Sequence, residues 1–453
     1  MLEGLIDDAA QRAARYLHGL PQRRVSPAAD DVARLRLLDI PLQDGPLEPE
    51  LVLAELDDIG SPATVATTGG RYFGFVVGGA LPASLAANLL AAAWDQNAAL
   101  EVMSPVASAL EEVCRKWLVS VLGLPADCEA GFVTGTTMAN LTALSAARHA
   151  LLRQVGWDVE AQGLFGAPPI TVIVGDEVHV SLLKALSILG LGRERVVRVP
   201  VDRQGRMRPD LLPPISGPTV VCLQSGNVNT GAFDPVDEIC PRAKEAGAWV
   251  HVDGAFGLWA AASPAFAHLV RGVENADSWS TDAHKWLNVP YDSGVVFVRS
   301  GADLRAAMSS PAAYLAEGQR RDPMRYVPES SRRARGIEIW AALRSLGRGG
   351  LAALIERDCR LASRFAAGFR AAGIEVLNDV VLNQVLVSFG EDDTTARVMA
   401  HVQEGGVCWC GGTVWQGRRA MRISVSSWAT TEADVDMSLQ AILRIATEEA
   451  GRT

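Results

Sequence analysis

Short apolar runs alternate with helical patterns through the middle of the chain, between about residues 130 and 300. The runs are rich in β-branched residues and apolar at consecutive positions. Strands of this kind, buried on both faces and joined by helices, form a mostly parallel sheet that helices cover on both sides. We therefore predict an α/β fold, whose strands cover residues 131–134, 170–174, 196–199, 219–223, 249–252, 277–280 and 294–298.

The two ends of the chain have different patterns. The first 125 residues are rich in Ala and Leu and favour helices, beginning with an amphipathic helix over residues 1–20. After residue 355, a helical pattern over residues 357–372, two alternating runs and a last helix from Thr431 suit a small α+β domain. We expect an N-terminal helical segment (residues 1–65), a large α/β domain (66–350) and a small C-terminal domain (351–453).

Composition narrows the class of protein. The 453 residues carry 42 Lys and Arg against 52 Asp and Glu, which argues against binding nucleic acid or an anionic membrane surface. The seven cysteines are scattered, as in a reducing compartment, and have no metal-binding spacing. Charges interrupt any secretory signal in residues 1–20, and the apolar stretch 80–94 is too short to span a bilayer. We expect a cytoplasmic protein without a metal.

Lys285 is the first candidate for chemistry. It follows a predicted strand in the segment Ser280-Thr-Asp-Ala-His-Lys-Trp286. A partly desolvated lysine becomes a better nucleophile toward an aldehyde, because burial lowers the pKa of its ammonium group. A loop lysine is more often an ordinary surface residue. The apolar Trp286 and the motifs upstream favour a functional role here.

Asp253 ends the preceding predicted strand, in the segment His251-Val-Asp-Gly-Ala255. One interpretation is a helix N-cap for the residues that follow. Paired with a lysine at the end of the next strand, the carboxylate could instead hold the proton on a pyridine nitrogen, so that the ring accepts electrons. Ala255 is small enough for a flat ring to lie against the strand.

Three further segments follow predicted strands. The turn Thr134-Gly-Thr-Thr-Met-Ala-Asn140 precedes a helical pattern, and its N–H groups and the hydroxyls of Thr136 and Thr137 suit a phosphate, although an ordinary helix cap looks the same. His179 could stack on a flat ring and bond a substrate carboxylate, or be an ordinary satisfied histidine. Asn227, in Gly226-Asn-Val-Asn229, could bond a ring hydroxyl.

Together these segments resemble the fold-type-I pyridoxal-phosphate enzymes, and among them the group II amino-acid decarboxylases that act on aromatic amino acids, glutamate or cysteine sulfinate. The resemblance covers roughly residues 65–345 and follows the family order. It rests on Ser104-Pro105 with Leu110-Glu111, the His179 segment, Gly231-Ala-Phe-Asp234, His251 to Ala255, His284-Lys-Trp286, and Ser331-Arg-Arg-Ala-Arg335 with Trp340.

The resemblance implies a role for each matching residue. Lys285 resembles the lysine that forms a Schiff base with pyridoxal 5'-phosphate, Asp253 the partner of the pyridinium nitrogen, and His179 the histidine that stacks on the ring. Thr136, Thr137 and His284 resemble phosphate contacts. The implied reaction converts an L-amino acid to its amine and carbon dioxide, in a homodimer whose sites lie at the subunit interface. An aldehyde synthase, a carbon–carbon lyase, an aminotransferase and a catalytically silent scaffold remain alternatives.

The chain also departs from the family pattern. Relatives use a loop tyrosine to reprotonate Cα, and here both Tyr314 and Tyr326 are candidates, of which we favour Tyr326. Asp282 stands where some relatives carry Asn, and an anion there would be unfavourable beside a phosphate unless it faces away. Gln96 and Asn97, with Ala99, fall where relatives line the substrate pocket. They indicate either a polar pocket or simply a helix end.

Overall fold

The computed structural model describes residues 2–309 and 321–451, and the chain divides into two compact units. The central unit comprises Gly78–Arg360 and Asn378–Gln384. The terminal unit comprises Met1–Val77, Leu361–Leu377 and Val385–Thr453, so that it combines residues from both ends of the chain. All the motifs that carry candidate chemistry belong to the central unit.

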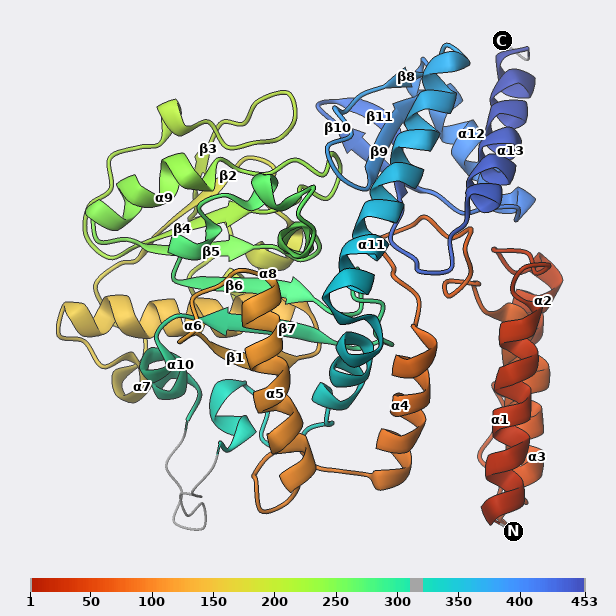
Figure 1. The fold of residues 1–453 in the computed structure, drawn as a ribbon, viewed down its shortest axis with the longest axis horizontal. Helices are drawn as coiled ribbons and strands as arrows, with labels where there is room; N and C mark the ends of the chain where they lie inside the picture. Colours follow the sequence, from red (N-terminus) through yellow and green to blue (C-terminus); the bar gives the residue numbers. More distant parts are fainter. Residues whose placement is uncertain (1, 310–320, 452–453) are drawn as a thin grey trace. The chain divides into compact units, whose positions relative to one another are not determined.

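A seven-stranded sheet forms the centre of this unit (Figure 1), with the strand order β1-β7-β6-β5-β4-β2-β3. Neighbours from β6 to β3 pair in parallel, whereas β7 is antiparallel to both β6 and β1. The predicted mostly parallel α/β sheet is therefore confirmed. Its strands are β1 (Glu129–Val133), β2 (Thr171–Gly175), β3 (Val197–Val199), β4 (Thr219–Gln224), β5 (Trp249–Asp253), β6 (Ser278–Asp282) and β7 (Gly294–Val298).

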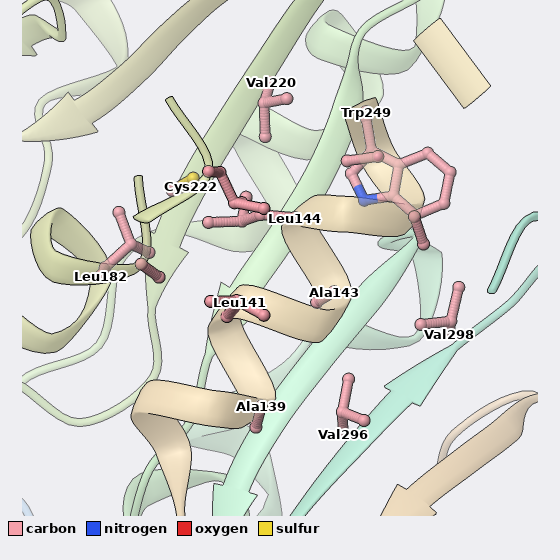
Figure 2. Packing of buried hydrophobic residues seen from close by; sticks show 14 of the residues in the cluster. Ala139, Leu141, Ala143, Leu144, Leu182, Val220, Cys222, Trp249, Val296 and Val298 are labelled. Atoms are coloured by element: carbon pink, nitrogen blue, oxygen red, sulfur yellow. The ribbon is translucent and has the colours of Figure 1, made fainter. Parts of the chain in front are cut away.

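Consecutive burial explains why these strands lack polar alternation. Every residue of β5, β6 and β7 is buried. On one side, α6 (Thr136–Gln154) packs across these strands and contacts α8 and α10. Figure 2 shows Leu141 and Leu144 of α6 in the same core cluster as Val220 and Trp249 of the sheet, with small alanines of α6 among them. Because 13 of the 19 residues of α6 are buried, the start of this helix is fixed against the sheet.

The other helices of the central unit connect these strands or precede them. They are α4 (Pro82–Trp94), α5 (Pro105–Val121), α7 (Val159–Gln162), α8 (Val180–Ile188), α9 (Val236–Glu245) and α10 (Gly301–Met308). A further helix, α11 (Gly336–Ala371), is interrupted at Gly347, whose φ of 59° is non-helical. The residues of α11 beyond Arg360 belong to the terminal unit.

The terminal unit contains a four-stranded sheet with the order β10-β11-β9-β8. Inside it, Tyr72 stacks on Trp409 with ring centroids 5.1 Å apart, so the aromatic residue between Cys408 and Cys410 has a packing role. Its strands are β8 (Glu375–Val376), β9 (Gln384–Ser388), β10 (Gly411–Trp415) and β11 (Arg418–Ser424), and its helices are α1 (Leu2–Gly19), α2 (Ala29–Arg34), α3 (Pro49–Glu55), α12 (Asp392–Gly405) and α13 (Glu432–Ala450).

Candidate active site

The candidate residues follow strands that end on the same edge of the central sheet. Asp253 is the last residue of β5 and Asp282 the last residue of β6. Backbone bonds link these ends: Ser225 N–H donates to the Asp253 carbonyl at 2.8 Å, and Asp282 N–H donates to the Ala255 carbonyl at 2.9 Å. Because parallel strands share one carboxyl edge, this edge is where a ligand site is expected.

Asp253 is held by two donors. Its Oδ2 accepts a hydrogen bond from Asn140 Nδ2 at 3.1 Å, and its Oδ1 accepts one from Ala255 N–H at 3.2 Å. The side chain is buried, with only 5% of the residue exposed. Ala255, beside Asp253, is half-buried. Part of its surface is thus open to a flat ring, as the sequence interpretation requires. The Ala255 bond is the local turn that an N-cap would make, so both sequence interpretations share this geometry.

Asn140 is a partner of Asp253 that the sequence reasoning did not assign. It lies in the first turns of α6, is fully buried, and bonds Asp253, His251 and Ser280. Its amide was visible in the sequence only as the last residue of the threonine-rich turn. The signal that could have found it is an amide on a helix whose neighbours are almost all apolar, because a buried amide must have partners.

The start of α6 faces a carboxylate of the chain itself. Thr136 N–H donates to Asp282 Oδ1 at 2.6 Å, and Asp282 Oδ2 lies 3.1 Å from Lys285 Nζ. The Asp282 side chain is 4% exposed and that of Lys285 17%. Asp282 therefore points toward the threonine-rich turn that was predicted to bind a phosphate, and not away from it. We call the start of this turn, Gly135 to Thr137, the phosphate cradle. Asp282 occupies the positive end of the helix and forms an ion pair with the candidate lysine.

The same cradle contains an unsatisfied hydroxyl. Thr136 is only 5% exposed. Its Oγ1 is buried and has no hydrogen-bond partner among the described residues. Thr137 follows it and is half-buried. Gly135 precedes both, and a side chain at Gly294 of β7 would collide with its backbone. Close approach at this glycine pair thus places the N-terminus of α6 directly against the sheet.

His284 lies on the other side of Asp282. Its Nδ1 accepts a hydrogen bond from Ser293 N–H at 3.1 Å, and its Nε2 lies 3.6 Å from Asp282 Oδ2. Tyr291 stacks on the imidazole with centroids 4.4 Å apart. Desolvation lowers the pKa of His284, against the opposing effect of Asp282. The neutral ring presents Nε2–H toward the cradle, since Nδ1 is already an acceptor.

His179 and Asn227 make local bonds at the same edge. His179 is the N-cap of α8, and its Nδ1 lies 2.7 Å from Ser181 Oγ. The preceding Val178 shares the lining of a cavity of about 10 Å³ with Asp253. Asn227 Oδ1 accepts hydrogen bonds from the N–H groups of residues 229 and 230, at 2.9 and 3.2 Å, so this oxygen shapes the turn.

Tyr326 lies away from these groups. It is 7% exposed, belongs to the core cluster on the α6 side of the sheet, and has the Arg321 guanidinium 3.4 Å from its ring centroid. Within residues 2–309 and 321–451, no hydrogen bond or ring contact joins it to Lys285 or Asp253. Tyr314, the other candidate, lies outside the described residues. The role of Tyr326 stays a prediction without geometric support.

Gln96 and Asn97 bond their own surroundings. Gln96 Nε2 donates to the Trp94 carbonyl at 2.8 Å, and its Oε1 accepts from Ser104 Oγ at 2.9 Å. Asn97 Oδ1 accepts from Ala99 N–H and Arg332 N–H at 3.1 and 3.2 Å. The Trp94 and Ala99 bonds are local, as at a helix end, whereas the Arg332 bond joins residues 235 positions apart. The polar pocket stays a prediction.

A mostly parallel sheet that gathers a lysine, an aspartate and a helix N-terminus at the carboxyl ends of its strands is typical of the fold-type-I pyridoxal-phosphate enzymes. Solved structures share this fold over nearly the whole chain. Rice TDC, solved with PLP and tryptamine, has a TM-score of 0.90 at 24% identity and covers 99% of this chain and 98% of its own. Mouse CSAD has a TM-score of 0.89 at 23% identity, with 98% of each chain covered.

The chain belongs to the pyridoxal-dependent decarboxylase family, because the model of the pyridoxal-dependent decarboxylase conserved domain matches residues 34–390. The family cofactor is pyridoxal phosphate. Among its relatives, L-tyrosine/L-DOPA decarboxylase 2 of Lophophora williamsii is 30% identical over 67% of this chain and 62% of its own length. Tryptophan decarboxylase 1 of Oryza sativa subsp. japonica is 27% identical over 88% and 84%, and acidic amino acid decarboxylase GADL1 of Bos taurus is 29% identical over 72% and 64%.

The residues present fit this cofactor, with one rearrangement. Asp253 presents a buried carboxylate to a ring nitrogen, and the unpartnered Thr136 hydroxyl lies where a phosphate oxygen would accept its hydrogen. The Thr136 N–H, however, already donates to Asp282. Across the described ranges, no cluster of metal ligands and no helix able to span a membrane is found.

Proposed function

We propose that this chain converts an L-amino acid to its amine and carbon dioxide, with Lys285 as the residue that holds pyridoxal phosphate. The observation that carries the proposal is the convergence of Lys285, Asp253 and the unsatisfied Thr136 hydroxyl on one edge of the sheet. Family membership supplies the reaction class, and relatives named for decarboxylation of tyrosine, tryptophan and acidic amino acids support it.

When bound, pyridoxal phosphate supplies an aldehyde carbon that captures amines and a cationic ring that accepts the electrons left behind as carbon dioxide departs. Lys285 would hold the cofactor through its Nζ. Asp253 would keep the proton on the ring nitrogen. Thr136, Thr137 and His284 would bond the phosphate, His179 would cover the ring, and Asn227 would adjoin the ring hydroxyl.

Attachment to Lys285 can be tested directly, because borohydride reduction makes the bond to the cofactor permanent. After reduction and proteolysis, mass spectrometry should find the pyridoxyl mass on the peptide that contains Lys285. Lys184→Ala, which removes an exposed lysine of α8, is the matched control and should leave the modified peptide unchanged. Modification of another lysine, or of none, would contradict the proposal.

Product analysis identifies the reaction and the substrate together. The cofactor-loaded protein is incubated in air with the common L-amino acids, dopa and cysteine sulfinate. We expect one amine, lighter than its precursor by carbon dioxide. The alternative is an aldehyde, as the name of a 26% identical relative, phenylacetaldehyde synthase of a Rosa hybrid cultivar, suggests. An oxo acid would instead indicate an aminotransferase.

We further propose a homodimer. The helix α1 has no buried residue, and Leu2 and Ile6 on it are 71% and 56% exposed. In α4, Leu89 and Leu90 are 58% and 54% exposed. Exposed leucine and isoleucine side chains on a helix are typical of an interface, and a second copy would cover them. Leu89→Asp should convert a dimer to a monomer in light scattering, whereas a wild-type monomer would contradict the proposal.

A reducing, cytoplasmic location completes the proposal. All seven cysteines are free and buried. A chain that matures in an oxidising compartment usually pairs its cysteines in disulfides. Fractionation of the source cells should therefore place the protein in the cytosolic fraction, and recovery from a secreted or periplasmic fraction would contradict this location.

A further inference from the structure

A continuous chain of buried polar side chains lies behind Asp253. His251 and Asp253 are two residues apart in β5 and point to the same face, where the strand register pairs them with Ser278 and Ser280 of β6. Asn140 reaches this face from α6. Asp253 is 5% exposed and the other four residues are 0% exposed, so each polar atom here depends on a partner within the protein.

The hydrogen bonds of this group form one line with a side branch. Its members share strands β5 and β6 and the start of α6. Trp249 Nε1 donates to Ser278 Oγ at 2.8 Å, Ser278 Oγ lies 2.9 Å from His251 Nδ1, His251 Nε2 lies 3.0 Å from Asn140 Oδ1, Ser280 Oγ donates to Asn140 Oδ1 at 2.7 Å, and Asn140 Nδ2 donates to Asp253 Oδ2 at 3.1 Å.

The two ends of the line fix the direction of every bond. The indole of Trp249 can only donate, and an ionised carboxylate can only accept. Asn140 must therefore present its NH₂ group to Asp253 and its oxygen to His251. The hydrogen of the neutral imidazole must then be on Nε2, and Nδ1 must accept from the Ser278 hydroxyl. Burial lowers the pKa of His251 to about 4, against the opposing charge of Asp253, so the ring stays neutral at pH 7.

We propose that Asn140 and His251 are positioning residues, which hold the Asp253 carboxylate in one orientation as the acceptor for the cofactor's pyridinium nitrogen. This inference rests on the proposed function. Every hydrogen bond in the line is donated in the direction of Asp253. No member of the line is therefore available to accept the proton of the cofactor ring from Asp253. A carboxylate oxygen can accept two hydrogen bonds, and Oδ1 accepts only one from Ala255 among the described bonds.

The first test uses the cofactor-free protein and does not depend on catalysis. Nitrogen-15 NMR of histidine-labelled protein at pH 7 should show the His251 ring as the neutral Nε2–H tautomer, assigned by its loss in His251→Gln. Trp249→Phe removes the first donor of the line and should shift the His251 Nδ1 signal. Trp279→Phe is the matched control, because the Trp279 indole is also buried but donates to the Val273 carbonyl, outside the line.

The second test measures the affinity for pyridoxal phosphate by quenching of tryptophan fluorescence. Asn140→Leu removes the donor to Asp253 and should raise the Kd by about ten- to a hundredfold, the effect expected for a hydrogen bond to a charged group. His251→Leu should act in the same direction, and His251→Gln, which keeps an N–H donor, should recover part of the loss. Circular dichroism checks that each variant is folded.

The outcomes separate this inference from the proposed function. An Nδ1–H tautomer or a charged His251 at pH 7 would overturn the directed line even if the cofactor binds normally. The expected tautomer with an unchanged Kd in folded Asn140→Leu would overturn the positioning role alone. If the wild-type protein shows the tautomer but binds no pyridoxal phosphate, the proposed function fails and the positioning role fails with it, while the line itself stands.

Discussion

The two ends of the candidate site are built differently. At the ring end, which comprises Asp253, Asn140, His251 and the serines behind them, each side chain donates or accepts in a consistent direction. At the phosphate end, which comprises Thr136, Asp282, His284 and Lys285, a carboxylate bonds the helix N-terminus and a buried hydroxyl has no partner.

The difference shows which part of the site is complete without its cofactor. In the proposed site, the ring end would need no change to receive a pyridinium nitrogen, since Asn140 and Ala255 already hold Asp253. On the proposal that a phosphate binds at the start of α6, the Asp282 carboxylate would first have to leave the Thr136 N–H, because two anions cannot share one helix N-terminus favourably. Asp282 would then compete with the phosphate for this position.

Loss of Lys285 is expected to have the largest effect. Lys285→Ala removes the proposed attachment point and leaves Asp282 without its ion-pair partner. Turnover of the amino acid identified by product analysis should fall by about a thousandfold or more, because covalent catalysis is lost. Amine release followed by chromatography measures this. Lys184→Ala serves again as the control, and more than a tenth of wild-type turnover in Lys285→Ala would break the assignment.

Acid should weaken the ring end through His251. Its pKa is about 4 in the folded chain against 6.5 for an ordinary histidine. Between pH 6.5 and pH 4, His251 binds a proton in the unfolded chain but not in the folded chain. The stability that this group contributes is therefore fully present above pH 6.5 and is lost as the pH falls toward 4. The free energy of unfolding should drop by up to ~1.4 kcal/mol per pH unit in this window.

Urea unfolding at pH 7 and pH 5 checks this slope. His251→Gln cannot titrate and should flatten the pH dependence, whereas His268→Gln, at an exposed position, should leave it unchanged. If the free energy of unfolding depends on pH equally in the wild type and in His251→Gln, the fold does not hold the His251 ring neutral. The ring end would then lose its consistent set of hydrogen-bond directions.

Asp282→Asn should sharpen the description of the phosphate end. The amide keeps an oxygen for the Thr136 N–H but removes the negative charge that opposes a phosphate. The Kd for pyridoxal phosphate should fall by roughly tenfold, whereas the Kd for pyridoxal, which lacks the phosphate, should not fall. Asp436→Asn is the control, because this carboxylate pairs with Arg364 at 2.6 Å within the terminal unit. Equal changes for both ligands would place the effect at Lys285 instead.

Tyr326→Phe should have the smallest effect. Its ring is buried against Arg321, outside both ends of the site, so loss of the hydroxyl should leave the ratio of amine to aldehyde unchanged. Mass spectrometry of both products measures the ratio. A rise in aldehyde would restore Tyr326 as the proton donor that the sequence suggests, and would require the segment around residue 326 to reach the substrate.

Sequence reasoning succeeded where one strand or turn carries the information. All seven strands of the central sheet were predicted to within a few residues, because burial on both faces leaves a continuous apolar pattern. Asp253 and Lys285 were predicted as site residues because Asp253 directly follows one such run and Lys285 lies a few residues beyond the next. The partners of these residues were not found. Asn140 bonds Asp253 across 113 residues, and Asp282 bonds Thr136 across 146, and no local pattern encodes such pairs.

The departure at Asp282 illustrates the limit. Residue type alone indicated that an anion beside a phosphate is unfavourable, but not which way the carboxylate points. Its direction depends on the close approach of Gly135 to Gly294, which brings the helix N-terminus to the end of β6. That approach is a property of packed backbones, and only the structure shows it.

All seven cysteine thiols are buried, so their reaction with a thiol reagent can report local opening of the folded chain. Burial raises the pKa of Cys222, on β4, well above its usual value, with a smaller contribution from Asp253, and raises that of Cys128 to about 12. A thiol reagent can therefore label each cysteine only when its surroundings open. Slower labelling of Cys222 after addition of pyridoxal phosphate, with Cys408 in the terminal unit as the reference, would report how far ligand binding suppresses opening of the sheet.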